Sequence, residues 1–253
     1  MSGKPMKKRL DVLLVERGLA ESRQKAQAMI LAGEIDVEGT KAQKAGVNVG
    51  ESARIEVHSR LQKYVSRGGF KLEGALEDFH VSVEDRICLD VGSSTGGFTD
   101  CLLQNGAMRV YAVDVNTDQL AWKLHQDERV IRIKKNAREL KRGDVTEEAS
   151  LVVADVSFIS VRKILPGACA CAIAGADFLI LIKPQFELER EDVGKGGIVR
   201  DPKLHEVAIA SVRAAAESLG LTIIGVAPSR LAGAEGNQEY FLHARKAARV
   251  ESQ

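Results

Sequence analysis

The chain has 253 residues, 45% of them hydrophobic and 28% charged, and its formal net charge is +1. This length and composition predict a soluble chain of one large and one small domain that can bury an apolar core. They exclude a membrane-spanning protein, since the longest uncharged stretch near the middle, residues 164–176, is too short to cross a bilayer. The N-terminus also lacks the apolar core of a secretory signal. We therefore expect a cytoplasmic protein with no membrane partner.

The four cysteines lie apart or in an apolar pattern, without the C-x-x-C pairs of a metal site. This usage is typical of a protein in a reducing compartment. We expect no bound metal and four buried, reduced thiols at Cys88, Cys101, Cys169 and Cys171.

Charge is distributed unevenly along the chain. Residues 1–71 hold 14 Lys/Arg against 8 Asp/Glu, whereas the remainder carries an excess of acid. Such asymmetry indicates a basic head that binds a polyanion, attached to a near-neutral body. A solvated basic face without a partner stays open as the alternative.

The head reads as a compact α+β module. Residues 10–18 form a short helical pattern, and Ser22 caps a second helix that continues to Leu31 and is stopped by Gly33. Residues 35–37 and 54–57 then read as short strands. The module closely resembles the RNA-binding domain named after ribosomal protein S-four, through the motifs at residues 9–11, 22–26 and 33–39. The physics of helix N-terminal amides and guanidinium groups agrees with phosphate binding, and we expect RNA contacts from Arg9, Arg17, Ser22, Arg23, Lys25 and, in the linker, Arg67.

Three parts are expected: the RNA-binding domain at 1–60, a polar linker at 61–69 with a hinge at its end, and a catalytic domain at 70–253. Within the last part, apolar strands alternate with helices, which predicts an α/β fold with a mostly parallel sheet covered on both faces. Residues 222–226 and 239–243 are joined by a Gly-rich connection and predict an antiparallel last strand. The expected strands before them are residues 87–91, 110–115, 130–133, 151–155 and 178–182.

The most informative stretch runs from Ile87 to Asp100, an apolar run that ends in an acid, a glycine-rich turn and a helical pattern. This is the strand, turn and helix opening of a Rossmann-like nucleotide-binding fold. Ser94 stands where a dinucleotide fingerprint needs its second glycine for a pyrophosphate. The loop therefore favours S-adenosylmethionine, which has an adenosine but no phosphates, while an ordinary βα turn is the alternative. The candidate cofactor residues are Asp90, Gly92, Ser93, Ser94, Gly96, Gly97, Phe98, Asp114, Val115 and Asn136.

Ligands of an open α/β sheet bind outside the carboxyl ends of its strands. Asp114 follows the second strand with the spacing of a carboxylate that accepts both ribose hydroxyls, and Asn136 after the third strand is a candidate for the adenine edge. Asp155 ends the fourth strand and Lys183 the fifth, while Glu239 begins the last one. The chain lacks the Asn/Asp-Pro-Pro-Tyr/Phe motif of amino-directed base methylation and a strand-end cysteine for carbon methylation, so both base-directed chemistries are disfavoured.

Lys71, Asp155, Lys183 and Glu239 match, in order and by element, the Lys-Asp-Lys-Glu tetrad of the FtsJ-like ribose 2′-O-methyltransferases. With its basic head, the chain resembles the TlyA family of ribosomal RNA methyltransferases over nearly its whole length. Further TlyA-like stretches lie at residues 66–72, 183–187 and 194–197. The resemblance implies methylation of a cytidine 2′-hydroxyl in ribosomal RNA with S-adenosylmethionine as cofactor, and a ribosomal subunit as partner. No protein partner is implied, and we expect a monomer.

We expect Lys183 to act as the base or to orient the hydroxyl. Whether Lys183 or Lys71 is the lysine that loses its proton stays open. A second basic stretch lies at residues 129–142. It extends the RNA-binding surface onto the catalytic domain, or, as the alternative, it is a charged surface loop. Three rival readings remain: a dinucleotide-dependent oxidoreductase, an RNA-binding assembly factor without turnover, and a haemolysin, a label that TlyA relatives have carried. The incomplete glycine motif disfavours the first, the intact tetrad the second, and the lack of a spanning segment the third.

Overall fold

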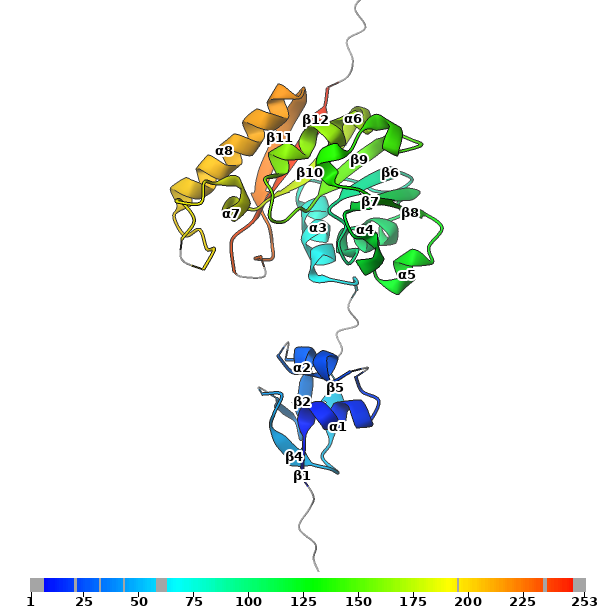
Figure 1. The fold of residues 1–253 in the computed structure, drawn as a ribbon, viewed down its shortest axis with the longest axis vertical. Helices are drawn as coiled ribbons and strands as arrows, with labels where there is room; N and C mark the ends of the chain where they lie inside the picture. The colour runs from blue at the N-terminus through cyan, green and yellow to red at the C-terminus, as the bar shows by residue number, and fades with distance from the viewer. Residues whose placement is uncertain are drawn as a thin grey trace, which may run out of the picture. The chain divides into compact units, whose positions relative to one another are not determined.

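The computed structural model describes residues 7–20, 22–31, 33–42, 44–57, 63–194, 196–233 and 236–247, and it divides the chain into two units, 1–63 and 64–253 (Figure 1). Residues 61 and 62 of the expected linker, and Lys195 of the glycine-rich stretch at 194–197, lie outside the described residues. Among the described residues, no helix combines the length and apolar character that crossing a membrane requires.

The N-terminal unit packs two helices, α1 (Leu10–Glu16) and α2 (Arg23–Leu31), with two small antiparallel sheets. One sheet pairs β1 (Lys7–Arg9) with β4 (Asn48–Gly50), and the other has the order β3 (Thr40–Lys41), β2 (Ile35–Val37), β5 (Ile55–Val57). Both helices and strands β2 and β5 were expected. Strands β1, β3 and β4 were not predicted, because their sequences, Lys-Lys-Arg, Thr-Lys and Asn-Val-Gly, show no alternation of apolar and polar residues. The core that joins these elements consists of Leu10, Leu14, Ala26, Met29, Ile30, Ile35 and Ala42.

The capping signals of α2 are confirmed. Ser22 Oγ accepts a hydrogen bond from Lys25 N at 3.2 Å, and so satisfies one of the orphan amides of the first turn. After the helix, Gly33 adopts a φ of +71°, the left-handed conformation that commonly follows a helix C-terminus.

The second unit is built on a seven-stranded sheet in the order β11-β12-β10-β9-β6-β7-β8. β12 runs antiparallel to both of its neighbours, β10 and β11, whereas the pairs among β10, β9, β6, β7 and β8 are parallel, which confirms the mostly parallel sheet with an antiparallel last strand. The chain winds outward in both directions from β6, so the strand order reverses between β6 and β9, where such folds bind ligands. The strands are β6 (Ile87–Val91), β7 (Arg109–Asp114), β8 (Val130–Lys134), β9 (Ala149–Ala154), β10 (Ala172–Ile182), β11 (Leu221–Pro228) and β12 (Tyr240–Lys246).

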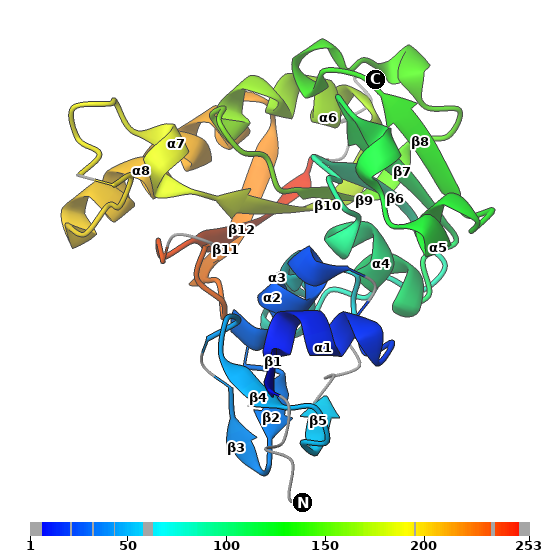
Figure 2. The same ribbon diagram turned by 60° about the horizontal axis from the view of Figure 1, so that its bottom comes forward.

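Helices cover both faces of this sheet (Figure 2). On one face, α3 (Arg67–Asp78) and α4 (Gly97–Gln104) pack on alternate strand residues such as Leu151 and Val153. On the other, α6 (Leu165–Ala170) and α8 (Pro202–Ser218) pack on the intervening residues, such as Val152. This double burial explains why the strands read as continuous apolar runs. The remaining elements are α5 (Trp122–His125), α7 (Pro184–Glu187) and the 3₁₀ turns η1 (Thr117–Gln119), η2 (Ala137–Glu139), η3 (Arg142–Asp144) and η4 (Val161–Lys163).

The expected linker needs a correction at its end, because α3 already begins at Arg67. Tyr64 is fully buried, and Val65 N donates a 2.8 Å hydrogen bond to Asp100 Oδ2 in α4. A Cβ atom on Gly69 would lie only 2.3 Å from Tyr64 Cγ. The glycine in this segment therefore allows close packing against Tyr64, and residues 66–69 are the anchored start of a helix and not a hinge.

Strand β10 is longer than expected, because residues 172–177 extend it toward its N-terminal end with a register shift against β9. The four cysteines are free and buried, as predicted.

Candidate active site

The turn between β6 and α4 requires its glycines. Gly92 has a φ of +89°, and a Cβ atom there would lie 2.3 Å from the carbonyl oxygen of Asp155. Gly96 has a φ of +94°, and a Cβ atom there would clash with the Leu124 side chain. Residues other than glycine are strained in this left-handed backbone conformation. The turn thus brings the ends of β6 and β9 into direct backbone contact.

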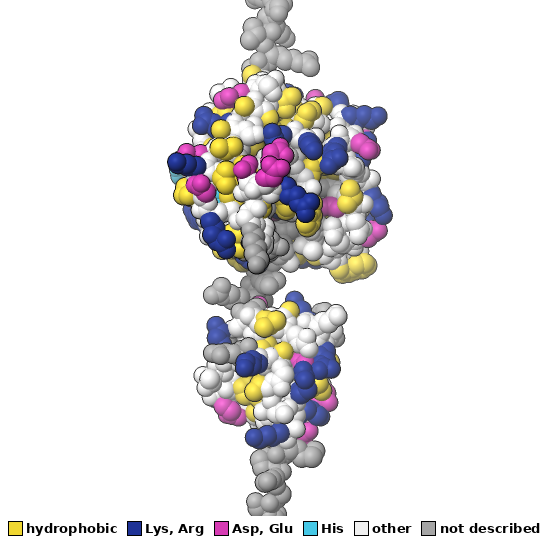
Figure 3. Space-filling view, turned by 60° about the vertical axis from the view of Figure 1, so that its left-hand side comes forward, with side chains coloured by type: hydrophobic (Ala, Val, Ile, Leu, Met, Phe, Trp, Pro, Cys, Tyr) yellow, Lys and Arg dark blue, Asp and Glu magenta, His cyan; other side chains and the backbone are white. Residues whose placement is uncertain are grey.

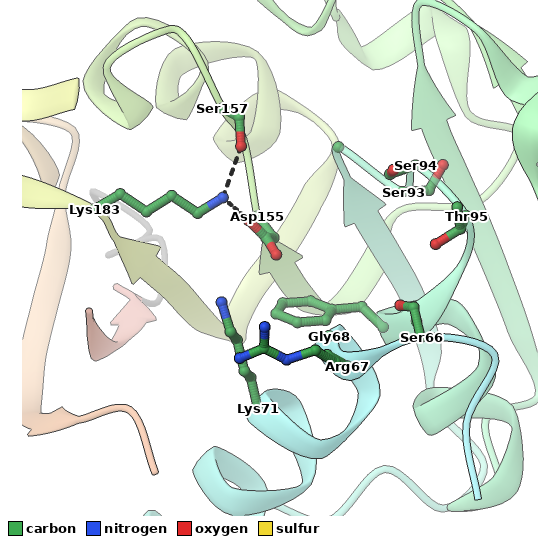
Figure 4. Close-up of a pocket in the computed structure, with 13 residues that line it drawn as sticks. Ser66, Arg67, Gly68, Lys71, Ser93, Ser94, Thr95, Asp155, Ser157 and Lys183 are labelled. Carbon is green, nitrogen blue, oxygen red and sulfur yellow. Dashed lines mark hydrogen bonds and ion pairs between the residues drawn. The ribbon is translucent and has the colours of Figure 1, made fainter. Parts of the chain in front are cut away.

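A cavity of about 230 Å³ opens at the carboxyl ends of β6, β9 and β10 (Figure 4). It is surrounded by the glycine-rich turn, the first turn of α3 and the loop after β9. Among the described residues, its lining consists of Ser66, Arg67, Gly68, Lys71, Gly92, Ser93, Ser94, Thr95, Gly97, Phe98, Asp155, Ser157 and Lys183. Most of the predicted loop residues and three of the predicted tetrad therefore share one cavity.

Asp90 lies behind this cavity and does not line it. Its carboxylate is completely buried, and Oδ2 accepts a 2.6 Å hydrogen bond from Thr99 Oγ1 at the start of α4. No described protein atom bonds Oδ1. Burial raises the pKa of Asp90 to about 7. In the protein alone, the carboxylate of this predicted cofactor residue joins the end of β6 to the first turn of α4.

Asp114 is placed to organise the other edge of the turn. Its Oδ2 accepts a hydrogen bond from Ser94 N at 3.0 Å, and its Oδ1 accepts one from Asn116 N at 3.0 Å. The neighbouring Val115 is 64% exposed. Asn136 accepts a 3.1 Å bond from Arg138 N and so caps η2. Asp114 ends β7, Val115 follows it and Asn136 follows β8, and all three lie outside the cavity lining.

The four tetrad residues form two ion pairs. Lys183 Nζ, after β10, lies 2.5 Å from Asp155 Oδ1 after β9. Lys71 Nζ, in α3, lies 2.5 Å from Glu239 Oε2 just before β12. Both lysines are at most 9% exposed, and Glu239 is 2% exposed. Lys71 and Glu239 are 168 residues apart in the sequence, yet the fold brings all four charged side chains to one edge of the sheet. There each lysine is paired with a carboxylate, which compensates its charge.

Two features of the loop after β9 were not predicted. Ser157 Oγ accepts a 2.8 Å hydrogen bond from Lys183 Nζ. Phe158 has a φ of +64° and is 92% exposed, and its ring centroid lies 5.4 Å from that of Phe186. An aromatic residue near a strand end is visible in the sequence, but its left-handed backbone and exposure are tertiary properties.

A second cavity of about 480 Å³ adjoins this loop. Its walls come from residues that follow Asp155 and Lys183 in sequence, together with η2. It combines aromatic and cationic groups, including Phe158, Phe186, Arg138, Arg162, Lys163 and Arg190.

In the N-terminal unit, a buried carboxylate fixes two of the predicted RNA contacts. Asp11 is fully buried and accepts hydrogen bonds from Arg9 Nη2 and Arg23 Nε, both at 2.9 Å, and from Gln27 Nε2 at 2.8 Å. The bonds from Arg9 are the largest cause that holds the pKa of Asp11 far below its usual range. The two guanidinium side chains stay about half exposed. Figure 3 shows Lys and Arg side chains on the face of this unit that is in view.

The other predicted RNA contacts divide into three kinds. Lys25 is exposed, and Ser22 caps α2. Arg17 is held by the fold, because it donates a 2.8 Å hydrogen bond to Ala53 O. Arg67 belongs to the second unit, where it lines the first cavity and donates to Ala232 O at 3.0 Å. It is therefore a candidate of the catalytic site and not of the basic head.

The sheet order and the glycine-rich turn define the class of S-adenosylmethionine-dependent methyltransferases. Solved methyltransferases share the fold at low identity: the magnesium protoporphyrin IX methyltransferase of Synechocystis, solved with bound SAH, aligns with a TM-score of 0.50 at 12% identity, over 75% of this chain and 88% of that one. Family models match an FtsJ-like methyltransferase over residues 64–246 and an S4 domain over residues 8–55. The chain belongs to the FtsJ-like methyltransferases and, within them, to the TlyA family.

Three relatives support this assignment. The 16S/23S rRNA (cytidine-2′-O)-methyltransferase TlyA of Mycobacterium tuberculosis is 45% identical over 94% of this chain and 89% of its own length. Hemolysin A of Brachyspira hyodysenteriae is also 45% identical, over 93% of this chain and 98% of its own. A solved structure from Streptococcus thermophilus that carries a hemolysin name is 41% identical, with a TM-score of 0.76 over 98% of this chain and 93% of that chain.

Proposed function

We propose that this chain transfers a methyl group from S-adenosylmethionine to the 2′-hydroxyl of a cytidine in ribosomal RNA. The observation that carries the proposal is the pair of buried Lys–carboxylate contacts, Lys183 with Asp155 and Lys71 with Glu239, at the carboxyl edge of the sheet. Only the first pair lies entirely in the cavity lining beside the glycine-rich turn. The named activity of the M. tuberculosis relative supports the same substrate.

The residues around the first cavity fit the cofactor. Gly92 and Gly97 let the turn pack closely against Asp155 O and Ser66 Oγ, and this packing shapes the cavity wall. The buried Ser93 Oγ has no described protein partner. Ser94 replaces a glycine that only a pyrophosphate would need, and Asp114 stands where ribose hydroxyls would be accepted. The bound cofactor supplies an electrophilic methyl group on a sulfonium.

We assign Lys183 as the group that orients the 2′-hydroxyl and, as a neutral amine, accepts its proton, because an ammonium has no lone pair to receive it. Its amine is fixed on two sides, by Asp155 Oδ1 at 2.5 Å and Ser157 Oγ at 2.8 Å, and it lines the cofactor cavity. Lys71 pairs with Glu239, a carboxylate that does not line this cavity. We therefore assign Lys71 to electrostatic support. Alignment of the hydroxyl for in-line displacement provides a large part of the rate, and proton removal adds to it.

The second cavity is the proposed site of the acceptor nucleotide. Its lining includes Gln185 and Phe186, two and three residues after Lys183, and Phe158, the residue after Ser157, so it is formed by the segments that carry the catalytic pair. Proteins hold splayed-out RNA bases against aromatic rings and their phosphates against cations. Phe158 supplies the ring, and Arg138, Arg162 and Lys163 supply the cations. The basic stretch predicted at 129–142 thus contributes Arg138 to this surface.

The S4 domain is the proposed selector of the ribosomal particle. Arg9 and Arg23, held by Asp11, and the exposed Lys25 present cations at the start of α2, where helix amides also favour phosphate.

The test is methyl transfer from labelled S-adenosylmethionine to purified small and large ribosomal subunits, followed by mapping of 2′-O-methylcytidine. We expect label in ribose of cytidine and none with Lys183→Ala. Label on a base, or none from the unmodified chain on either subunit, would contradict the proposed function.

A further inference from the structure

Glu187, at the end of α7, joins two segments that the proposed reaction depends on. It is only 7% exposed. Its Oε2 accepts a hydrogen bond from Ser160 Oγ at 2.6 Å, and its Oε1 accepts one from Val161 N at 2.7 Å. Arg162 adds a bond from Nε to Oε2 at 3.2 Å and one from Nη2 to the Glu187 carbonyl at 3.2 Å. We call these four bonds the Glu187 clasp.

The clasp joins the segment that follows β9 to the segment that follows β10. The loop after β9 carries Asp155, Ser157 and Phe158 before it reaches Ser160. On the other side, Lys183 lies immediately before α7, whose last residue is Glu187. The two segments are therefore joined at two places: Lys183 contacts Asp155 and Ser157 close to the strands, and the clasp joins the segments a few residues further on. The separation of the two segments is therefore fixed at both places.

The enclosed loop holds a residue in an unfavourable state. Phe158 has a left-handed φ of +64° and exposes 92% of its surface. A bulky residue in this region is strained and persists only where its surroundings impose it. Ring contact with Phe186 covers little of Phe158, so most of the constraint comes from the anchored backbone on either side.

We propose that Glu187 is a positioning residue, which holds the loop after β9 so that Phe158 projects into the acceptor cavity and Ser157 meets Lys183. The inference rests on the proposed function. Glu187 lines the second cavity and not the first, and Ser157, which it helps to position, contacts the proposed hydroxyl-orienting Lys183, so we expect its effect on the RNA side of the reaction. Arg162, which is 39% exposed in its side chain, links the clasp to the cationic wall of the second cavity.

The experiment compares Glu187→Ala with Glu191→Gln, a matched loss of charge at an exposed residue outside both cavities. We measure kcat and KM for ribosomal RNA, the Kd of S-adenosylmethionine by calorimetry, and amide exchange in residues 157–161. For Glu187→Ala we expect kcat/KM for RNA to fall at least about tenfold, since small misplacements near the reacting atoms have such effects. The cofactor Kd should stay within about twofold, and exchange in the loop should rise. Ser160→Ala removes the 2.6 Å bond to Glu187 together with the bonds that Ser160 Oγ accepts from Arg162 N and Nε, but it keeps the Glu187 carboxylate and its bond to Val161 N. It should act in the same direction and guards against a folding defect.

A double-mutant cycle with Phe158→Ala decides whether the clasp acts through this ring. Because the two residues are coupled in the proposal, Glu187→Ala should cost much less in the Phe158→Ala background. Equal kinetics for Glu187→Ala and the unmodified chain, an equal loss of cofactor affinity, or full additivity with Phe158→Ala would overturn the inference. An inactive unmodified chain would instead sink the proposed function itself.

Discussion

Lys183 Nζ lies 2.5 Å from Asp155 Oδ1 and donates a 2.8 Å hydrogen bond to Ser157 Oγ, so two oxygens from one loop fix a single amine in the lining of the first cavity. Residues 26 and 28 positions away in the sequence meet there because β9 and β10 are parallel neighbours. The amine is thereby aimed without further movement of its flexible side chain, and the same contact defines the first prediction.

Lys183→Ala should abolish methyl transfer while cofactor binding survives. The substitution removes the proposed proton acceptor but leaves the glycine-rich turn intact. We expect turnover to fall at least about a hundredfold, the lower range for loss of a general base, and the calorimetric Kd of S-adenosylmethionine to stay within about threefold. Lys203→Ala, an exposed lysine at the start of α8, is the matched control and should be unchanged. Turnover by Lys183→Ala at the unmodified rate would remove this residue from the mechanism.

Lys71→Met should destabilise the fold more than the paired double variant Lys71→Met/Glu239→Leu. The single change leaves the buried Glu239 carboxylate without its 2.5 Å partner, which costs about 3–5 kcal/mol for a broken buried pair. Replacement of both charges by apolar groups restores much of that free energy, because neither residue then carries a buried charge. Urea unfolding measures stability, and methyl transfer should be lost in both variants. A double variant that is less stable than the single one would contradict this account of the pair.

Gly92→Ala should weaken cofactor binding strongly. The new Cβ would lie 2.3 Å from the Asp155 carbonyl oxygen, on a backbone with a φ of +89°, so the turn and the loop after β9 must move apart. We expect calorimetry to show at least about a tenfold rise in the Kd of S-adenosylmethionine, which corresponds to about 1.4 kcal/mol. Gly143→Ala, where a Cβ meets no atom within 4 Å, is the control. Equal affinity in the Gly92 and Gly143 variants would show that the turn tolerates a side chain.

Arg23→Ala/Lys25→Ala should reduce both the affinity for ribosomal RNA and its dependence on salt. Each lost phosphate contact lowers the slope of log K against log salt by about 0.7–0.9, because fewer counterions are released. Binding measured between low and moderate salt by filter retention gives this slope. Lys203→Ala again serves as a surface control. A double variant with weaker binding and an unchanged slope would refute the proposed cationic contact.

Asp90→Asn should stabilise the cofactor-free protein at pH 8 but not at pH 4. Burial raises the pKa of Asp90 to about 7, from an ordinary value of about 3.9. The folded chain therefore holds a proton that the unfolded chain releases, and this carboxyl lowers stability as pH rises from about 4 to about 7. Asparagine does not ionise, and its carbonyl can still accept the bond from Thr99. Thermal unfolding at the two pH values measures the difference, and a variant that is less stable than the unmodified chain at pH 8 as well as at pH 4 would contradict it.

Local patterns in the sequence were enough to predict most of the fold. Apolar runs such as Ile87–Val91 are buried on both sides, so they indicate a parallel sheet without knowledge of their neighbours. Ser22 and Gly33 marked the ends of α2 because capping depends on residues close in the chain. The segment 66–69 was assigned wrongly to a hinge, since glycine permits both flexibility and close packing, and only the buried Tyr64 against Gly69 distinguishes them.

Part of the candidate site was likewise predictable from the sequence, and part of it depends on the tertiary structure. The sequence by itself determined the residue types at the strand ends, Asp155, Lys183 and Glu239, and the glycine-rich turn that we propose as the adenosine site. Tertiary structure alone decided which lysine pairs with which carboxylate, that Ser157 shares Lys183, and that Glu187 anchors the loop of Phe158. Strand and helix signals arise from neighbours along the chain, whereas these contacts depend on strand order and on backbone angles imposed by distant segments.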